Sequence, residues 1–248
     1  GAGVAANLGT VGIGEDTGGS IRIPASCCNL FGIRVTTGLI SRTGLSPLVT
    51  RQDTAGPMAR TVTDMTRLLD VLVGYDAADR WTGAAHQADS EDYLDQLDAD
   101  ALEGARLGVL RDAFGDDSDP DAAPVNDVVE TALGRIADAG ATLVDPVTIP
   151  DLDERIQETS LYVLQSKHDL NDFFSARDDA PVDSVTELYE RGAYHDKLDL
   201  FADIATDGPA DPTTDETYWQ KVAAQEALRR EIRYVHAEHD LDALIFPD

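Results

Sequence analysis

The chain has 248 residues, of which 42% are apolar, so it is long enough to bury one large hydrophobic core or two small ones. It carries 47 acidic and 19 basic residues, a net charge of −28, which makes nucleic acid and anionic membranes poor partners. No apolar run is long enough to cross a bilayer. The two cysteines, Cys27 and Cys28, are adjacent; we interpret them as small buried apolar residues of a reduced, cytoplasmic protein.

The charge is unevenly distributed along the chain. Residues 1–76 hold six acids and six bases, whereas residues 77–248 carry the whole negative excess. We interpret the first part as a mostly buried core and the second as an acidic peripheral region with a large solvated surface. Lysine is rare, and an acidic, lysine-poor surface resembles that of haloarchaeal proteins. Molar salt shortens the Debye length to about 3 Å, so the composition predicts a salt-loving source.

The first predicted elements are short. A buried strand at residues 10–14 leads into a Gly-rich turn at 15–20 and a short helix from 21 to about 30. A second strand is expected at 31–35. Residues 36–57 are rich in Gly, Ser, Thr and Pro, which predicts a long segment that is mostly loop.

The rest of the chain alternates helical and strand patterns. Helices are expected at 60–74, 123–139, 152–175, 183–191 and 214–239, with weak helical character around 91–97. Strands are expected at 106–110, 141–144 and 243–246. This alternation predicts an α/β sheet with mostly crossover connections.

The segment that carries chemistry lies around the first turn. A strand ends in Asp16-Thr17-Gly18-Gly19, and Ser20 follows where a helix can begin. Two glycines let the backbone turn sharply and direct several N–H groups to one side, which forms a nest for an anion. A helix N-terminus adds its dipole to that nest. A serine at its rim is placed to attack a carbonyl whose oxygen enters the nest.

Gly-Gly-Ser alone is also typical of an ordinary turn before a helix. A phosphate-binding loop is a second alternative, but no lysine follows the glycines and the spacing of that motif is absent. The longer string around the turn decides between these interpretations.

Residues 16–25, Asp-Thr-Gly-Gly-Ser-Ile-Arg-Ile-Pro-Ala, resemble the core signature of the amidase signature family. Two further blocks resemble the family in the same order, at residues 32–42 and 53–64. From residue 77 on, only the order of elements and short fragments fit. Glu15 stands where small or polar residues are common in the family, and we interpret it as a surface adaptation to salt.

The resemblance implies a fold, a reaction and a set of site residues. The fold is α/β, with a mixed, mostly parallel central sheet flanked by helices, here an incomplete single domain over residues 1–248. The reaction is hydrolysis of a small-molecule amide through a serine acyl-enzyme, with release of ammonia or an amine and no metal or cofactor. Ser20 matches the nucleophile, the N–H groups of Thr17, Gly18, Gly19 and Ser20 match the oxyanion hole, and Asp16 and Arg22 match positions that support the loop.

The resemblance also implies a second serine and a lysine upstream of the nucleophile, which activate it. Ser20 is the first serine of this chain and Lys167 its first lysine. A serine hydroxyl is a weak nucleophile without a base. The chain also begins without Met and ends inside an apolar strand, so we expect a piece of a longer protein, truncated at both ends and inactive alone.

Two other functions stay open at this point. One is an amidotransferase A-type subunit that supplies ammonia to misacylated tRNA, and the other is a non-catalytic domain that keeps only the anion nest. A homodimer also stays open. His236 and His239 have a spacing that allows metal ligation, but we interpret them as part of a solvated helix face because no third ligand is placed beside them. His168 is not expected to be catalytic, and we interpret Trp81, Trp219 and the tyrosines as core or rim aromatics rather than cofactor contacts.

Overall fold

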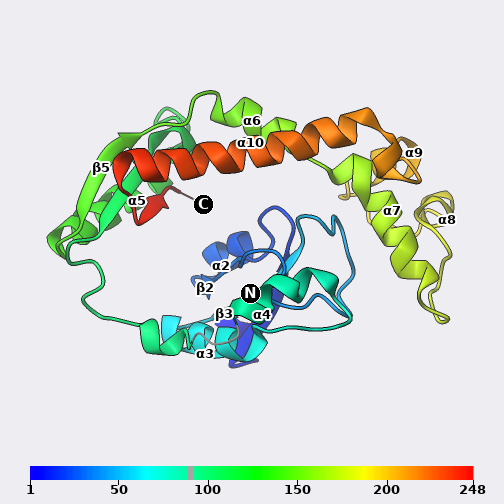
Figure 1. Cartoon of the computed structure of the whole chain (residues 1–248), viewed down its shortest axis with the longest axis horizontal. Coiled ribbons are helices and arrows are strands. Elements are labelled where there is room, and N and C mark those ends of the chain that lie inside the picture. Colours follow the sequence, from blue (N-terminus) through cyan, green and yellow to red (C-terminus); the bar gives the residue numbers. More distant parts are fainter. Residues whose placement is uncertain (89–91, 248) are drawn as a thin grey trace. The chain divides into compact units, whose positions relative to one another are not determined.

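The computed structural model describes residues 1–88 and 92–247 (Figure 1). It divides into two compact units, each made of two separate stretches of chain. The first unit contains Gly1–Leu97 and Leu161–Tyr218, and the second contains Asp98–Ser160 and the chain from Trp219 onward. A single domain over residues 1–248 stays a prediction. Among the described residues, no helix combines the length and the apolar character that a membrane span needs.

The first unit is built on an antiparallel sheet in the order β1-β3-β2. Its strands are β1 (Val11–Asp16), β2 (Phe31–Gly32) and β3 (Thr54–Ala59). All six residues of the central strand β3 are buried. The register pairs Asp16 with Thr54, so β1 ends beside the start of β3 and delivers the Gly-rich turn to that edge of the sheet.

Short helices follow the strands of this unit. They are α1 (Ala2–Ala5), α2 (Arg22–Cys27), α3 (Val62–Leu72) and α4 (Ala85–Ala88), with 3-10 turns at Arg80–Ala84 and Leu94–Gln96. The side chain of Thr61 caps α3 by accepting a hydrogen bond from Asp64 N at 3.1 Å. Leu69 of α3 packs with the buried Val35, Ile40 and Ala55, which fixes the helix on the sheet.

The second stretch of the first unit is helical. It contains α7 (Tyr162–Ser175), α8 (Val185–Glu190), α9 (Phe201–Thr206), a 3-10 turn at Pro212–Thr214 and the start of α10 (Glu216–His239). Val185, Phe201, Ile204 and Ala205 form its buried cluster. This cluster anchors α7, which contacts the Gly-rich turn described below.

The second unit is built on a parallel sheet in the order β5-β4-β6. Its elements are β4 (Arg106–Leu110), a 3-10 turn at Arg111–Ala113, α5 (Ala122–Asp138), β5 (Thr142–Val147), α6 (Leu152–Glu158), most of α10, and β6 (Ala243–Ile245). Val235 of α10 packs with Leu110 and Val147 in the buried core of this unit. One antiparallel sheet, one parallel sheet and the flanking helices confirm the predicted α/β class.

Several sequence predictions differ from the structure. Residues 54–59 form the central strand β3, whose first four residues fall at the end of the segment predicted to be mostly loop, 36–57. The helix predicted over 152–175 is two helices, α6 and α7, with a break at Thr159–Leu161. Cys27 is exposed and Cys28 is half-buried, so the interpretation of Cys27 as a buried residue is wrong. Of the helix predicted weakly at 91–97, residue 91 lies outside the described residues and only Leu94–Gln96 is helical.

Candidate active site

The Gly-rich turn connects the end of β1 to the start of α2. β1 stops at Asp16, residues 17–19 bend, and Ser20 follows with an exposed side chain. Gly19 has φ +145°, a conformation that side-chain-bearing residues rarely adopt. The turn therefore presents the Ser20 hydroxyl at the surface of the first unit.

The carboxylate of Asp16 organises this turn from inside. The side chain is completely buried. It accepts hydrogen bonds from Gly19 N at 2.7 Å and Ile21 N at 3.1 Å. It also accepts the Nε groups of Arg22 and Arg34, each at 3.2 Å. One buried carboxylate thus fixes both sides of Ser20 along the backbone.

These contacts decide the protonation state of Asp16. Burial raises the pKa of this carboxyl, but the hydrogen bonds from Arg22, Ile21 N and Gly19 N together outweigh burial and hold the pKa below its ordinary value. The carboxylate is ionised at neutral pH, and it can accept every one of these donors.

The backbone N–H of Gly19 forms a hydrogen bond that its predicted role does not include. The resemblance in sequence assigns the N–H groups of Thr17, Gly18, Gly19 and Ser20 to an oxyanion hole. Gly19 N donates to Asp16 Oδ1 at 2.7 Å, because the buried carboxylate draws this N–H to the inside of the turn. The amides of Thr17, Gly18 and Ser20 remain the candidate oxyanion donors.

A tyrosine that the sequence analysis did not select lies against the turn. A Cβ atom added to Gly18 would lie 2.5 Å from Tyr162 Oη, so the phenol group of α7 touches the glycine directly. Burial, Asp16 and Asp53 raise the pKa of Tyr162, so its hydroxyl is protonated and can donate a hydrogen bond. No local signal in the sequence reveals this placement, since it depends on α7 packing onto a loop far away in the chain.

Three side chains join α7 to the segment that precedes β3. Thr50 donates to Asp169 Oδ2 from both its N–H, at 2.7 Å, and its hydroxyl, at 2.9 Å. Gln165 Nε2 donates to the same oxygen at 2.9 Å. Burial raises the pKa of Asp169, and these hydrogen bonds oppose that effect. The contacts hold Tyr162, at the start of α7, in place over the turn.

Asp53 links this segment to the turn itself. Its Oδ1 accepts the hydroxyl of Thr17 at 2.6 Å, and the backbone N–H groups of Leu48 and Val49 donate to the same carboxylate. Gln52 Nε2 reaches the carbonyl oxygen of Thr17 at 3.5 Å. Residue 17 is thereby held through both its side chain and its carbonyl oxygen.

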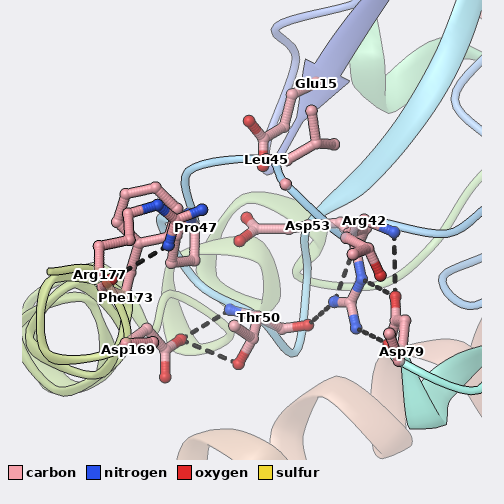
Figure 2. A pocket seen from close by; sticks show the side chains of 14 residues that line it. Glu15, Arg42, Leu45, Pro47, Thr50, Asp53, Asp79, Asp169, Phe173 and Arg177 are labelled. Atoms are coloured by element: carbon pink, nitrogen blue, oxygen red, sulfur yellow. Dashed lines mark hydrogen bonds and ion pairs between the residues drawn. The ribbon is translucent and has the colours of Figure 1, made fainter. Parts of the chain in front are cut away.

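A pocket of about 300 Å³ lies within the first unit beside Asp53 (Figure 2). Its wall includes Glu15, whose Oε1 is buried. Burial first, and then the charge of Asp53, raise the pKa of Glu15 to about 7, while Arg42 opposes the rise. The interpretation of Glu15 as a surface adaptation to salt is therefore wrong: its carboxyl faces a pocket.

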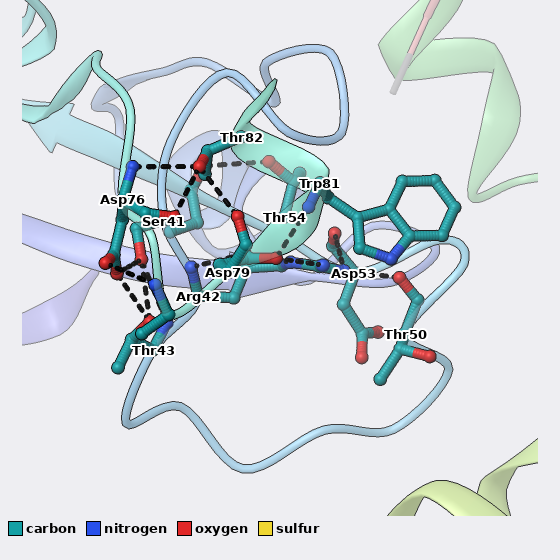
Figure 3. A network of polar contacts seen from close by, with 12 residues as sticks. Ser41, Arg42, Thr43, Thr50, Asp53, Thr54, Asp76, Asp79, Trp81 and Thr82 are labelled. Atoms are coloured by element: carbon teal, nitrogen blue, oxygen red, sulfur yellow. Dashed lines mark hydrogen bonds and ion pairs between the residues drawn. The ribbon is translucent and has the colours of Figure 1, made fainter. Parts of the chain in front are cut away.

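Arg42 also lines this pocket, and it forms a network of polar contacts (Figure 3). Its Nε and Nη2 donate to the two oxygens of Asp79, each at 3.0 Å, and Nη1 donates to the carbonyl oxygen of Thr50. The guanidinium also lies over the Trp81 ring, 5.4 Å from its centroid. The network ties the loop before β3 to the segment after α3.

The histidines form no metal centre in the described part of the chain. Within residues 1–88 and 92–247, no three side chains of His, Cys, Asp or Glu are placed to hold a metal ion. His236 Nδ1 lies 3.2 Å from the carbonyl oxygen of Leu241, and His168 Nδ1 lies 2.9 Å from that of Ala210. Both rings therefore contact backbone carbonyl groups.

Comparison with known proteins assigns the chain to a family. A family model described as Amidase matches residues 1–248. The chain belongs to the amidase family. The A-type subunit of the glutamyl-tRNA(Gln) amidotransferase from Nitrosomonas eutropha is 34% identical over 211 residues, which are 84% of this chain and 40% of that relative. The corresponding subunit from Chlorobium chlorochromatii is 41% identical over 150 residues, 60% of this chain and 30% of the relative.

Solved amidase structures share the fold over almost the whole chain. An amidase family protein from Bacillus anthracis has a TM-score of 0.82 at 30% identity and covers 98% of this chain. The native peptide amidase from Stenotrophomonas maltophilia has a TM-score of 0.77 at 32% identity, with the same coverage. This amidase chain spans only 47% and 50% of those two chains, so it corresponds to about half of an amidase.

Proposed function

We propose that this chain carries the nucleophile of a serine amidase, an enzyme that hydrolyses a carboxamide C–N bond. The observation that supports the proposal is the turn fixed by Asp16, in which Ser20 is exposed and the neighbouring Gly18 lies against the Tyr162 phenol. The chain's membership of the amidase family supports the same reaction.

In the proposed reaction, Ser20 Oγ attacks the carbonyl carbon of a small amide. The carbonyl oxygen becomes an oxyanion, which the amides of Thr17, Gly18 and Ser20 stabilise; one such donor is worth about a hundredfold or more in rate. The C–N bond then breaks, and ammonia or an amine leaves with a proton. Water hydrolyses the resulting ester and restores the Ser20 hydroxyl.

The proposal requires a base for the Ser20 proton. Among the described residues, no side chain forms a hydrogen bond with the Ser20 hydroxyl, and the amine of Lys167 donates instead to the carbonyl oxygen of Ala205 at 2.7 Å. The resemblance in sequence assigns the base to an upstream lysine and serine. We therefore propose that activity belongs to a longer polypeptide that contains this chain.

The test is Ser20→Ala in that longer polypeptide, with ammonia release from a small primary amide as the readout. Loss of the nucleophile is expected to lower kcat by at least about 10⁴-fold, with the fold intact by circular dichroism. Ser26→Ala is the matched control, because Ser26 is an exposed serine of α2 close along the chain. Amide hydrolysis retained by Ser20→Ala contradicts the mechanism.

The names of the sequence relatives favour a second candidate, the A-type subunit of an amidotransferase that supplies ammonia to misacylated tRNA. Release of ammonia from glutamine that depends on added partner subunits supports this candidate. Hydrolysis of small amides by the polypeptide alone supports the amidase. A domain that keeps only the anion nest would show neither activity, even with the upstream sequence present.

The proposal also covers the cellular location, the source and the oligomeric state of the protein. We propose a cytoplasmic enzyme of a salt-loving organism, on the strength of the acidic, lysine-poor composition. The homodimer stays a prediction that gel filtration tests.

A further inference from the structure

The carboxyl group of Glu15 carries a buried acceptor without a donor. Its Oε1 is shielded from solvent and accepts no hydrogen bond from any described residue. A buried polar atom left unpaired is costly, so the Glu15 carboxyl is a group that an added donor or positive charge would stabilise. Glu15 faces the pocket in Figure 2 from the strand that leads into the turn.

The other charged groups around this pocket are already paired. Arg42 donates to Asp79 and to backbone carbonyl oxygens. The carboxylate of Asp53 accepts three donors, and that of Asp169 accepts Thr50 and Gln165.

The guanidinium carbon of Arg177 lies over the Phe173 ring, 3.4 Å from its centroid, and Arg177 donates to the carbonyl oxygen of Phe173. Four acids and two arginines line the pocket, so negative charge is in excess when Glu15 is ionised. The charge excess disfavours an anion and favours a cation.

We propose that this pocket binds a primary ammonium group, with the Glu15 carboxylate as its counter-ion. An ammonium supplies three N–H donors and one positive charge, which match the carboxylate of Glu15 in the pocket wall and the charge excess. Leu45, Pro47 and Phe173 supply apolar surface for the alkyl chain that carries it. A metal ion fits less well, because it requires several free oxygen ligands and Glu15 alone offers one.

The ammonium can come from two sources with the same chemistry. One is a free alkylamine, such as an amine released from an amide. The other is a lysine side chain from a part of the longer polypeptide outside this chain. Ser20 does not line the pocket, so the proposed binding of an ammonium does not require the Ser20 hydroxyl.

Ionisation of Glu15 makes the binding depend on pH. Burial and Asp53 raise the pKa of Glu15 to about 7, whereas an alkylammonium stays protonated well above that pH. The ionised carboxylate is the form that binds. Affinity is therefore expected to rise about tenfold from pH 6 to pH 8, as the ionised fraction of Glu15 rises.

The first experiment is calorimetric titration of the 248-residue chain with n-butylammonium chloride at pH 6 and pH 8, at constant ionic strength. Glu15→Gln is expected to weaken binding at pH 8 by at least about tenfold, because glutamine keeps the shape of the protonated carboxyl and removes the charge. Glu190→Gln, at an exposed glutamate of the same unit, is the matched control and is expected to bind as the unaltered chain does. Tetramethylammonium, which has the charge but no N–H donor, is expected to bind at least about tenfold more weakly.

The second experiment distinguishes the two sources. The pKa of the Glu15 carboxyl is measured by carbon NMR in the longer polypeptide. A lysine in the pocket lowers that pKa to or below the ordinary glutamate value of about 4.3 and blocks n-butylammonium. A pocket open to free amines still binds n-butylammonium, and Ser20→Ala leaves that binding unchanged.

Two results overturn the proposal. One is equal binding of n-butylammonium by the unaltered chain and by Glu15→Gln. The other is no binding by the chain together with a Glu15 carboxyl that still titrates near pH 7 in the longer polypeptide. Loss of amidase activity in Ser20→Ala with amine binding retained separates this site from the proposed reaction.

Discussion

The two glycines before Ser20 are needed for different physical reasons. Gly19 adopts φ +145°, so a side chain there is strained whatever space surrounds it. Gly18 is limited by its neighbour instead: a Cβ atom there would lie 2.5 Å from Tyr162 Oη and no closer than 3.6 Å to the ring itself. The requirement for glycine at position 18 thus comes from a single hydroxyl of α7.

The Tyr162 hydroxyl can be tested directly at the residue scale. Gly18→Ala is expected to destabilise the chain by about 1–3 kcal/mol, because the methyl group overlaps that hydroxyl. Tyr162→Phe removes the hydroxyl and leaves the ring. The double variant is expected to recover at least about 1 kcal/mol relative to additive effects, measured by urea unfolding.

Gly19→Ala provides the control for this cycle. Its cost comes from backbone conformation and from the Ile23 side chain, 2.6 Å from an added Cβ atom, so Tyr162→Phe is expected to leave that cost unchanged. Additive effects of Gly18→Ala and Tyr162→Phe would show that the phenol does not contact the turn as the structure places it.

The residues of the candidate site differ in how far the sequence predicts them. Asp16 and Ser20 belong to one continuous motif, and the chemistry of a Gly-Gly-Ser turn after a strand can be argued from those residues alone. Tyr162 and the pocket face of Glu15 could not be predicted, since both depend on packing between segments far apart in the chain. The hydrogen bond from Gly19 N to Asp16 could not be predicted either, because it depends on the backbone geometry of the turn and the residue types do not specify that geometry.

At the scale of elements, periodic helices were predictable and the central strand was not. α3, α5 and α10 lie within two residues of their predicted ranges because one face of each is apolar. β3 contains Gly56 and Pro57 and is buried on both faces, so it shows no alternation of polar and apolar residues. The predicted helix at 152–175 breaks where the chain passes from one unit to the other, at Ser160 and Leu161.

Arg42 joins two loop segments of the first unit, and its geometry requires a guanidinium. Two of its nitrogens bind Asp79 while a third reaches the Thr50 carbonyl oxygen. Arg42→Lys replaces this fork with a single ammonium, so it is expected to destabilise the chain by about 2–3 kcal/mol in urea unfolding. Arg51→Lys is the matched control, since no described residue forms an ion pair with Arg51. Equal effects of the two variants would contradict the role of Arg42.

At the scale of the whole molecule, the net charge of −28 predicts a dependence on salt. Repulsion among the acidic side chains favours the unfolded chain in dilute buffer, and molar salt screens it. The melting temperature is expected to rise by at least about 10 °C between about 0.1 M and about 3 M KCl. Sucrose is the control, because it favours compact states by exclusion from the surface without screening charge. A melting temperature that is the same at about 0.1 M and at about 3 M KCl removes support for a salt-loving source.

The order of strands in the second unit has a consequence for synthesis on the ribosome. β4 lies between β5, which follows it soon in the sequence, and β6, which follows only after α5, α6, the helices of the other unit and α10. One edge of β4 therefore stays unpaired while the intervening helices emerge, including the whole stretch that folds into the other unit. During translation this nascent strand is an exposed template for pairing with other chains, and the arrival of β6 is what closes it.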